Sequence, residues 1–92
     1  MTKEKLLTTA INTYGHMPQK LMAIEEMSEL AKEICKDFRG NNNRDKISEE
    51  MADVEIMLAQ LKLIYSNHGS VRKWTNIKLR RLAQRLGVAY DD

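Results

Sequence analysis

The chain has 92 residues, of which 42% are hydrophobic and 30% are charged, and its formal net charge is +2. This composition predicts one globular domain rather than a disordered segment, and a single proline with four glycines argues against a turn-rich all-β fold. The small net charge does not require a nucleic acid as partner. A chain this short buries a small fraction of its surface, so we expect a homo-oligomer to enlarge the core.

The chain shows no targeting or membrane-spanning pattern. Its amino terminus lacks the apolar run of a signal peptide, and no segment approaches ~18 consecutive apolar residues. We therefore expect a soluble, cytoplasmic protein with no membrane partner. The single cysteine, Cys35, excludes an internal disulfide, and its position among apolar residues predicts that it is buried.

Apolar periodicity and chain-breaking residues predict an all-α fold of four helices. In chain order, these helices cover about residues 2–14, 18–38, 44–66 and 70–86. Gly15 ends the first helix, and Pro18 suits the first turn of the second. The Gly40–Asn43 run is the clearest loop signal. Ser70 is the expected N-cap of the fourth helix, and Gly87 is its expected C′ residue.

The second predicted helix separates apolar from acidic residues. At about 100° per residue, an apolar arc lies nearly opposite a narrow acidic stripe, and we expect the arc to face the core. The arc contains Ile24, Met27, Ala31, Ile34, Cys35 and Phe38, whereas the stripe contains Glu26, Glu29 and Glu33 together with Met22.

The third predicted helix has two apolar arcs, which implies two packing partners. One arc contains Ile47, Met51, Val54, Leu58, Leu61 and Tyr65, and the other contains Ala52, Ile56, Ala59 and Leu63. We expect one arc to pack within the subunit and the other against a second copy. Glu50 and Asp53 flank the first arc, so they should point into the bundle.

Two acidic clusters are the most informative motif, Glu25-Glu26-Met27-Ser28-Glu29 and Glu49-Glu50-Met51-Ala52-Asp53. Each places two carboxylates at i and i+3. A short loop makes the two helices antiparallel, and carboxylates about 5 Å apart repel by roughly 3 kcal/mol per pair at an effective dielectric of about 20. Protonation, pairing with Lys or Arg, or a bound metal would neutralise them. An all-oxygen set without histidine suits Mg²⁺, or Mn²⁺ as a substitute, better than zinc.

The fourth predicted helix carries the opposite charge. Lys78, Arg81 and Arg85 are spaced i, i+3 and i+7 and share one face, with Trp74 one turn earlier on the same side. Together with a metal, these cations would clamp a polyphosphate. A plain solvated surface explains the cations equally well, and Trp74 is either the half-buried edge of a core or a base-stacking residue.

The spacing of the carboxylates is specific. Glu25-Glu26-x-x-Glu29, twenty intervening residues and Glu50-x-x-Asp53 resemble the EExxE and ExxD signature of MazG-like, all-α nucleoside triphosphate pyrophosphohydrolases. The resemblance covers nearly the whole chain. It implies a four-helix MazG-like bundle completed as a dimer or tetramer. It also implies hydrolysis of a nucleotide to monophosphate and pyrophosphate, with water attacking the α-phosphorus.

The resemblance also implies roles for individual residues. It makes Glu26, Glu29, Glu50 and Asp53 the metal ligands and assigns catalytic roles to Glu25 and Glu26, although the part played by Glu25 stays open. The implied substrate-binding residues are Lys78, Arg81, Arg85, Trp74 and Gln19.

Three functions are compatible with the sequence. A Mg²⁺-dependent nucleotide pyrophosphohydrolase is the leading hypothesis, and the second is a non-catalytic nucleotide-binding or regulatory protein on the same scaffold. The third is a helical interaction module, or a nucleic-acid binder that uses the fourth helix and responds mainly to salt. The sequence does not predict which base a nucleotide ligand carries.

Overall fold

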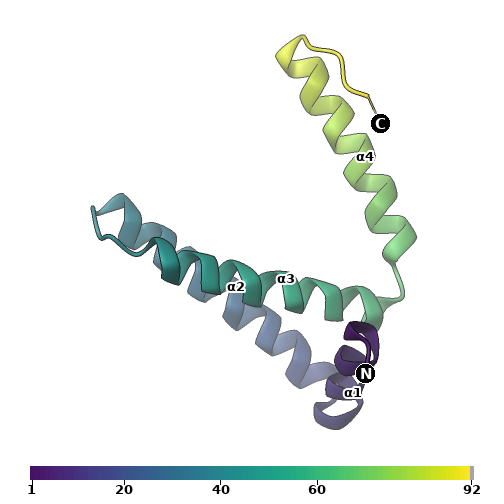
Figure 1. The fold of residues 1–92 in the computed structure, drawn as a ribbon. Helices are drawn as coiled ribbons and strands as arrows, with labels where there is room; N and C mark the ends of the chain where they lie inside the picture. Colours follow the sequence, from purple (N-terminus) through teal and green to yellow (C-terminus); the bar gives the residue numbers. More distant parts are fainter. Residues whose placement is uncertain (92) are drawn as a thin grey trace.

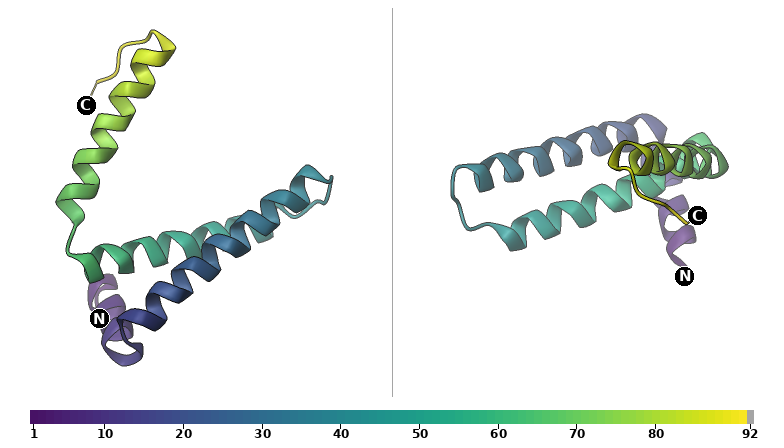
Figure 2. Two further views of the ribbon diagram at one scale, coloured as in Figure 1. Left: turned by 180° about the vertical axis from the view of Figure 1, so that it is seen from behind. Right: turned by 90° about the horizontal axis from the view of Figure 1, so that it is seen from above.

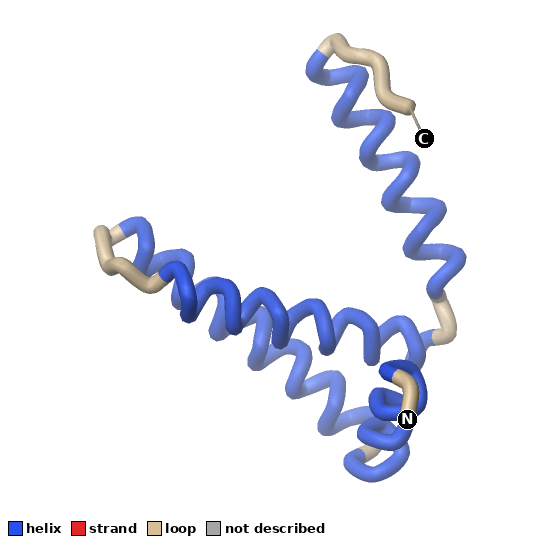
Figure 3. The backbone as a smooth tube through the Cα atoms, viewed as in Figure 1, coloured by secondary structure: helices blue, strands red, loops and turns tan. Residues whose placement is uncertain are grey.

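The computed structural model describes residues 1–91, which contain four helices and no strand (Figure 1; Figure 3). The helices are α1 (Lys3–Tyr14), α2 (His16–Phe38), α3 (Arg44–Tyr65) and α4 (His68–Leu86). The predictions of an all-α fold and of four helices are therefore confirmed. None of the described helices combines the length and apolar character that a membrane span requires.

The helix boundaries follow local backbone chemistry. Gly15, with φ +97°, separates α1 from α2 in a conformation that side-chain-bearing residues rarely adopt. Gly87 ends α4 with φ +69°, as predicted. The predicted N-cap at Ser70 is wrong, because the chain already turns at Ser66, which has φ +50°, and α4 begins two residues later with Asn67 at its N-cap position.

Helices α2 and α3 form an antiparallel hairpin, and α1 packs against both at the end where α2 begins and α3 ends (Figure 2). The hydrophobic core of this three-helix unit is small. It comprises Leu7 and Ile11 of α1, Ala23 of α2 and Met57 of α3. A core of this size supports only marginal stability in a single chain.

The contact line between α2 and α3, here called the seam, is rich in polar side chains. Its buried members are Gln19, Ala23 and Glu33 on α2 and Glu50, Met57 and Gln60 on α3. Ala23 is 1% exposed, so the two helices approach closely at this small residue. The buried side of α2 thus includes Glu26 and Glu33 of the acidic stripe, and the prediction that the opposite, apolar arc faces the core is wrong.

The apolar arcs of α2 and α3 remain largely uncovered. On each helix, the apolar arc is rotated about the helix axis by about 100° from the seam, in the direction of increasing residue number. Because the two helices are antiparallel, both arcs fall on the same side of the hairpin. We call this side the outer face. Its most exposed large side chains are Ile24, Met27, Ile34 and Phe38 of α2 and Met51, Leu58 and Tyr65 of α3. Cys35 shares this arc and is exposed, so its predicted burial is wrong.

The second apolar arc of α3 lies on the other side of the hairpin. There, Leu7 of α1 lines a small cavity together with Ala59 and Leu63 of α3. Helix α1 therefore packs on this arc within the same chain. It is one of the two packing partners that the two arcs of α3 predict.

Helix α4 does not join the packed unit of α1, α2 and α3. It leaves the end of α3 through Ser66 and Asn67 and extends away from the hairpin (Figure 1; Figure 2). Trp74, Leu82 and Leu86 are exposed along α4. The four helices therefore do not close into one bundle within a single chain.

Candidate metal centre

Three carboxylates converge halfway along the seam. One carboxylate oxygen each of Glu26, Glu50 and Asp53 lies within 4.8 Å of the others. Glu26 comes from α2, whereas Glu50 and Asp53 come from successive turns of α3. We call these three residues the acidic cluster. The prediction that Glu50 and Asp53 point into the helical unit is confirmed, because Glu50 is buried and Asp53 is half-buried.

Glu50 is the central member of the acidic cluster and is 5% exposed. Its Oε1 atom lies 3.2 Å from the Nζ atom of Lys46, whereas its Oε2 atom is buried without a hydrogen-bond partner. A buried acceptor without a partner costs roughly 1–3 kcal/mol, and more when it is charged. This oxygen can therefore gain from a cation or a donor brought to the cluster.

The electrostatics of Glu26 reflect its place in the cluster. Burial raises the pKa of Glu26 above its ordinary value of 4.5, and the neighbouring charges of Asp53 and Glu50 raise it further. A carboxyl group with a raised pKa in the folded state stabilises the fold when it is protonated. The metal-free protein should therefore become more stable as the pH falls through the folded-state pKa of Glu26.

This reasoning gives a prediction for Glu26→Gln. In EDTA at pH 7, the variant should melt about 4–8 °C above the wild type, because relief of ~1 kcal/mol of repulsion and desolvation corresponds to that shift in a domain of this size. The difference should shrink as the pH falls through the folded-state pKa of Glu26, because the wild-type carboxyl group then becomes protonated too. Thermal melts followed by circular dichroism from pH 5 to 8 measure this dependence.

Exposed Glu55 on α3 offers a matched control for that series. Glu55→Gln should leave the melting temperature nearly unchanged at every pH, since surface substitutions away from such features have small effects. A Glu26→Gln variant that melts below the wild type at pH 7 would contradict the electrostatic account.

The structure does not bring every predicted acidic residue into the cluster. Glu29 lies one turn beyond Glu26, about 60° further round α2, and is exposed at the border of the seam. Glu25 is exposed as well. The roles assigned to these two residues therefore stay predictions.

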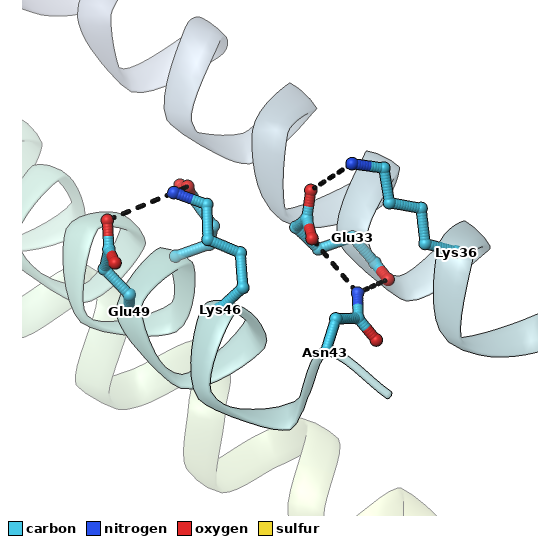
Figure 4. Close-up of polar contacts among 6 residues, drawn as sticks. Glu33, Lys36, Asn43, Lys46 and Glu49 are labelled. Carbon is cyan, nitrogen blue, oxygen red and sulfur yellow. Dashed lines mark hydrogen bonds and ion pairs between the residues drawn. The ribbon is translucent and has the colours of Figure 1, made fainter. Parts of the chain in front are cut away.

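A polar network closes the loop end of the seam (Figure 4). The Nδ2 atom of Asn43 donates to the backbone oxygen of Glu33 at 2.8 Å and to its Oε1 atom at 3.0 Å, and Lys36 contacts the Oε2 atom of Glu33 at 3.2 Å. The hydrogen bond from Asn43 and the nearby lysines lower the pKa of Glu33. This network ties the start of α3 to α2.

Lys46 is a site residue that sequence reasoning missed. Its Nζ atom lies 3.2 Å from an oxygen of Glu49 (Figure 4). The same atom lies 3.2 Å from the Oε1 atom of Glu50. These two contacts raise the pKa of Lys46 and keep it charged. The i, i+4 spacing of Lys46 and Glu50 was a readable signal for this pair. Lys46 occupies one oxygen of Glu50 and leaves the other, Oε2, without a partner.

Two buried glutamines lie further along the seam, toward α1. Gln19 is 5% exposed and Gln60 is 4% exposed, and the Oε1 atom of Gln60 has no hydrogen-bond partner. Gln19 was expected to bind substrate, and Gln60 had no sequence signal. Each lies seven residues from a cluster carboxylate, Glu26 or Asp53, which is about 10 Å along its helix.

The unpaired oxygen of Gln60 gives a second prediction. Gln60→Met removes a buried acceptor while keeping a similar side-chain volume, so the free energy of unfolding should rise by about 1 kcal/mol. Urea denaturation measures the change. Gln84→Met, at an exposed glutamine of α4, is the matched control and should change stability by less than about 0.5 kcal/mol. If Gln60→Met lowered the free energy of unfolding and Gln84→Met did not, the amide of Gln60 would make favourable contacts and the prediction would be wrong.

The predicted cationic residues do share one surface of α4. Lys78, Arg81 and Arg85, here called the basic stripe, line one hollow together with Gln84. Trp74 is 48% exposed, and Lys73 lies 5.9 Å from its ring centroid. Because α4 extends away from the hairpin, the structure does not place the basic stripe or Trp74 beside the acidic cluster of the same chain (Figure 1).

Comparisons of the chain with models of known protein families, with curated proteins and with solved structures found no match. Functional inference therefore starts from the residues of the site.

Proposed function

We propose that this protein is a Mg²⁺-dependent nucleotide pyrophosphohydrolase of the MazG-like type, which hydrolyses a nucleoside triphosphate or related nucleotide to a monophosphate and pyrophosphate. The observation that carries the proposal is the convergence of Glu26, Glu50 and Asp53, together with the buried Oε2 atom of Glu50, which has no hydrogen-bond partner. The EExxE and ExxD spacing of the sequence supports the same reading.

The residues of the acidic cluster fit a hard divalent cation. Three carboxylate oxygens from two helices form an all-oxygen donor set, which Mg²⁺ and Mn²⁺ prefer. Glu26, Glu50 and Asp53 would hold the ion, and Glu29, at the border of the seam, is the proposed fourth ligand. When bound, the metal would lower the pKa of a coordinated water and offset charge on the phosphate.

The protein groups have separate tasks in this reaction. Lys46 holds one oxygen of Glu50 and thereby orients its carboxylate. Glu26, whose pKa is raised, and Glu25 beside it are the proposed acceptors of the proton from the attacking water. The water oxygen forms a bond to the α-phosphorus, the bond from that phosphorus to the bridging oxygen breaks, and pyrophosphate leaves with the bonding electrons. Lys78, Arg81 and Arg85 would bind the phosphates, and Trp74 and Gln19 would contact the nucleoside.

We further propose that the protein works as a homo-oligomer, a dimer or a tetramer, in the cytoplasm. The outer face exposes large apolar side chains on both helices of the hairpin, including Phe38 at 86% exposure. Contiguous apolar surface of this kind marks an interaction site in most soluble proteins. A second copy would cover it and enlarge a core that is small in one chain.

A nucleotide panel tests the proposed activity. The wild-type protein is incubated with ribo- and deoxyribonucleoside triphosphates in Mg²⁺, and the release of monophosphate and pyrophosphate is followed by chromatography. Activity should require Mg²⁺ or Mn²⁺ and stop in EDTA. Folded protein that turns over no nucleotide would overturn the proposal, and Mg²⁺-dependent binding without product would select the non-catalytic nucleotide-binding alternative.

A further inference from the structure

We propose that the basic stripe of α4 completes the acidic cluster of a second copy, so that each nucleotide site is shared between two chains. The inference rests on the proposed function and adds where the phosphate-binding half of the site comes from. The two chains would exchange their α4 helices reciprocally, as a closed two-fold assembly requires.

The strongest support is the segregation of charge along the chain. Helix α4 contains six Lys or Arg residues and no Asp or Glu, whereas residues 16–65, the α2–α3 hairpin, contain seven Lys or Arg and ten Asp or Glu. The helix therefore carries +6 and the hairpin −3, with the histidines taken as neutral. Opposite charges on two separate parts of one chain favour docking of one part on the other.

The fold keeps these two parts separate within one chain. Lys78 lies ten residues beyond the start of α4, about 15 Å along that helix, and Asp53 lies twelve residues before the end of α3, about 18 Å in the other direction. The two helices diverge from their connection at Ser66 and Asn67 (Figure 1; Figure 2). The basic stripe thus extends away from its own acidic cluster.

Exposed apolar residues on α4 favour a protein surface as its partner. Leu82 is 42% exposed and Leu86 is 66% exposed, on the same helix as the basic stripe. A polyanion such as nucleic acid would neutralise the cations but would leave these leucines in water. A second copy offers a negatively charged hairpin that also exposes apolar side chains, so it matches α4 in charge and in apolar character.

Complementation between two inactive variants tests the shared site. One chain carries Asp53→Asn, and the other carries Lys78→Ala with Arg81→Ala. Each is inactive alone. The two variants are unfolded together and refolded as an equal mixture, so that half of the dimers contain one chain of each kind. Each mixed dimer has one intact site out of two. About one quarter of the wild-type turnover should therefore return. A mixture no more active than its parents would overturn the proposal.

A matched mixture controls for non-specific rescue. Asp53→Asn and Glu50→Gln both lie in the acidic half of the site, so a shared site predicts that their mixture stays inactive. Turnover restored in this control would also overturn the assignment of halves to different chains.

Cross-linking gives a second readout that does not depend on activity. In a Cys35→Ala background, one chain carries Arg81→Cys and the other carries Glu29→Cys, at the exposed border of the acidic cluster. Mixed chains should form a disulfide-linked heterodimer on a non-reducing gel. Leu79→Cys replaces Arg81→Cys in the control, because it lies at a similar height on the opposite side of α4 and should not cross-link.

The two readouts separate failure of the arrangement from failure of the proposed function. A wild-type protein without turnover whose Arg81→Cys and Glu29→Cys chains still cross-link would refute the hydrolase but support the exchange of α4. An active wild type whose variants neither complement nor cross-link would refute the exchange alone, with α4 folding back on its own hairpin instead.

Discussion

Asp53→Asn should abolish most of the catalytic turnover without unfolding the protein. We expect the rate of pyrophosphate release to fall by about 10²–10³-fold, the range found when one element that stabilises the charge of a transition state is removed. Asp53 is half-buried in the acidic cluster, and its charge raises the pKa of Glu26. Removing that charge relieves repulsion, so the melting temperature in EDTA should not decrease.

The response to Mg²⁺ provides an independent measurement on the same variant. A ligand at 100 times its dissociation constant stabilises the folded state by about 2.7 kcal/mol. Wild-type protein should gain this stability in excess Mg²⁺, whereas Asp53→Asn should gain little. Asp37→Asn, an exposed carboxylate at the end of α2, is the matched control and should retain both turnover and the Mg²⁺ response. Unchanged turnover in Asp53→Asn would rule out the acidic cluster as the reaction centre.

The sequence predicts the helices well because their ends depend on local chemistry. Gly15 and Gly87 adopt positive φ angles that favour glycine, so both positions could be recognised without knowledge of the fold. The start of α4 could not, since Ser66 takes a left-handed conformation that its residue type does not predict. Ser70 is a good N-cap residue, but by that point in the chain α4 has already begun.

The orientation of α2 could not be predicted from its periodicity. An apolar arc indicates which side of a helix avoids water, but not whether its own chain or another copy covers that side. In this protein the seam contains the buried Ala23 and Met57, and the more apolar side of α2 stays exposed. In a short chain that buries few apolar residues, the side of a helix that its own chain covers is easily confused with the side that stays exposed.

The acidic cluster was predictable in part for a similar reason. Glu50 and Asp53 border an apolar arc, and this was enough to place them inside the helical unit. Glu26 and Glu29 share the acidic stripe, yet only Glu26 lies on the seam. Side chains three residues apart on an α-helix differ in direction by about 60°, which is enough to leave Glu29 at the border. Gln60 lies on the seam, so its burial depends on how α2 packs against α3, and no local pattern encodes that contact.

Leu58→Glu should convert the proposed oligomer to a monomer. Leu58 lies on the outer face of α3 and is 45% exposed in the single chain. In a symmetric interface the substitution introduces two carboxylates, one from each copy, and removes two apolar contacts. Substituting a central apolar residue of an interface commonly costs 2 kcal/mol or more, so the dissociation constant should rise by at least about 30-fold.

Sedimentation velocity over a range of protein concentrations measures this change. Ala52→Glu provides the control, because Ala52 is exposed on the other side of α3 and the same charge there should leave the assembly intact. If α4 completes the site of a second copy, turnover of Leu58→Glu should fall in proportion to the fraction of monomer and recover at high protein concentration. A Leu58→Glu variant that sediments like the wild type at every concentration would exclude the outer face as the interface between copies.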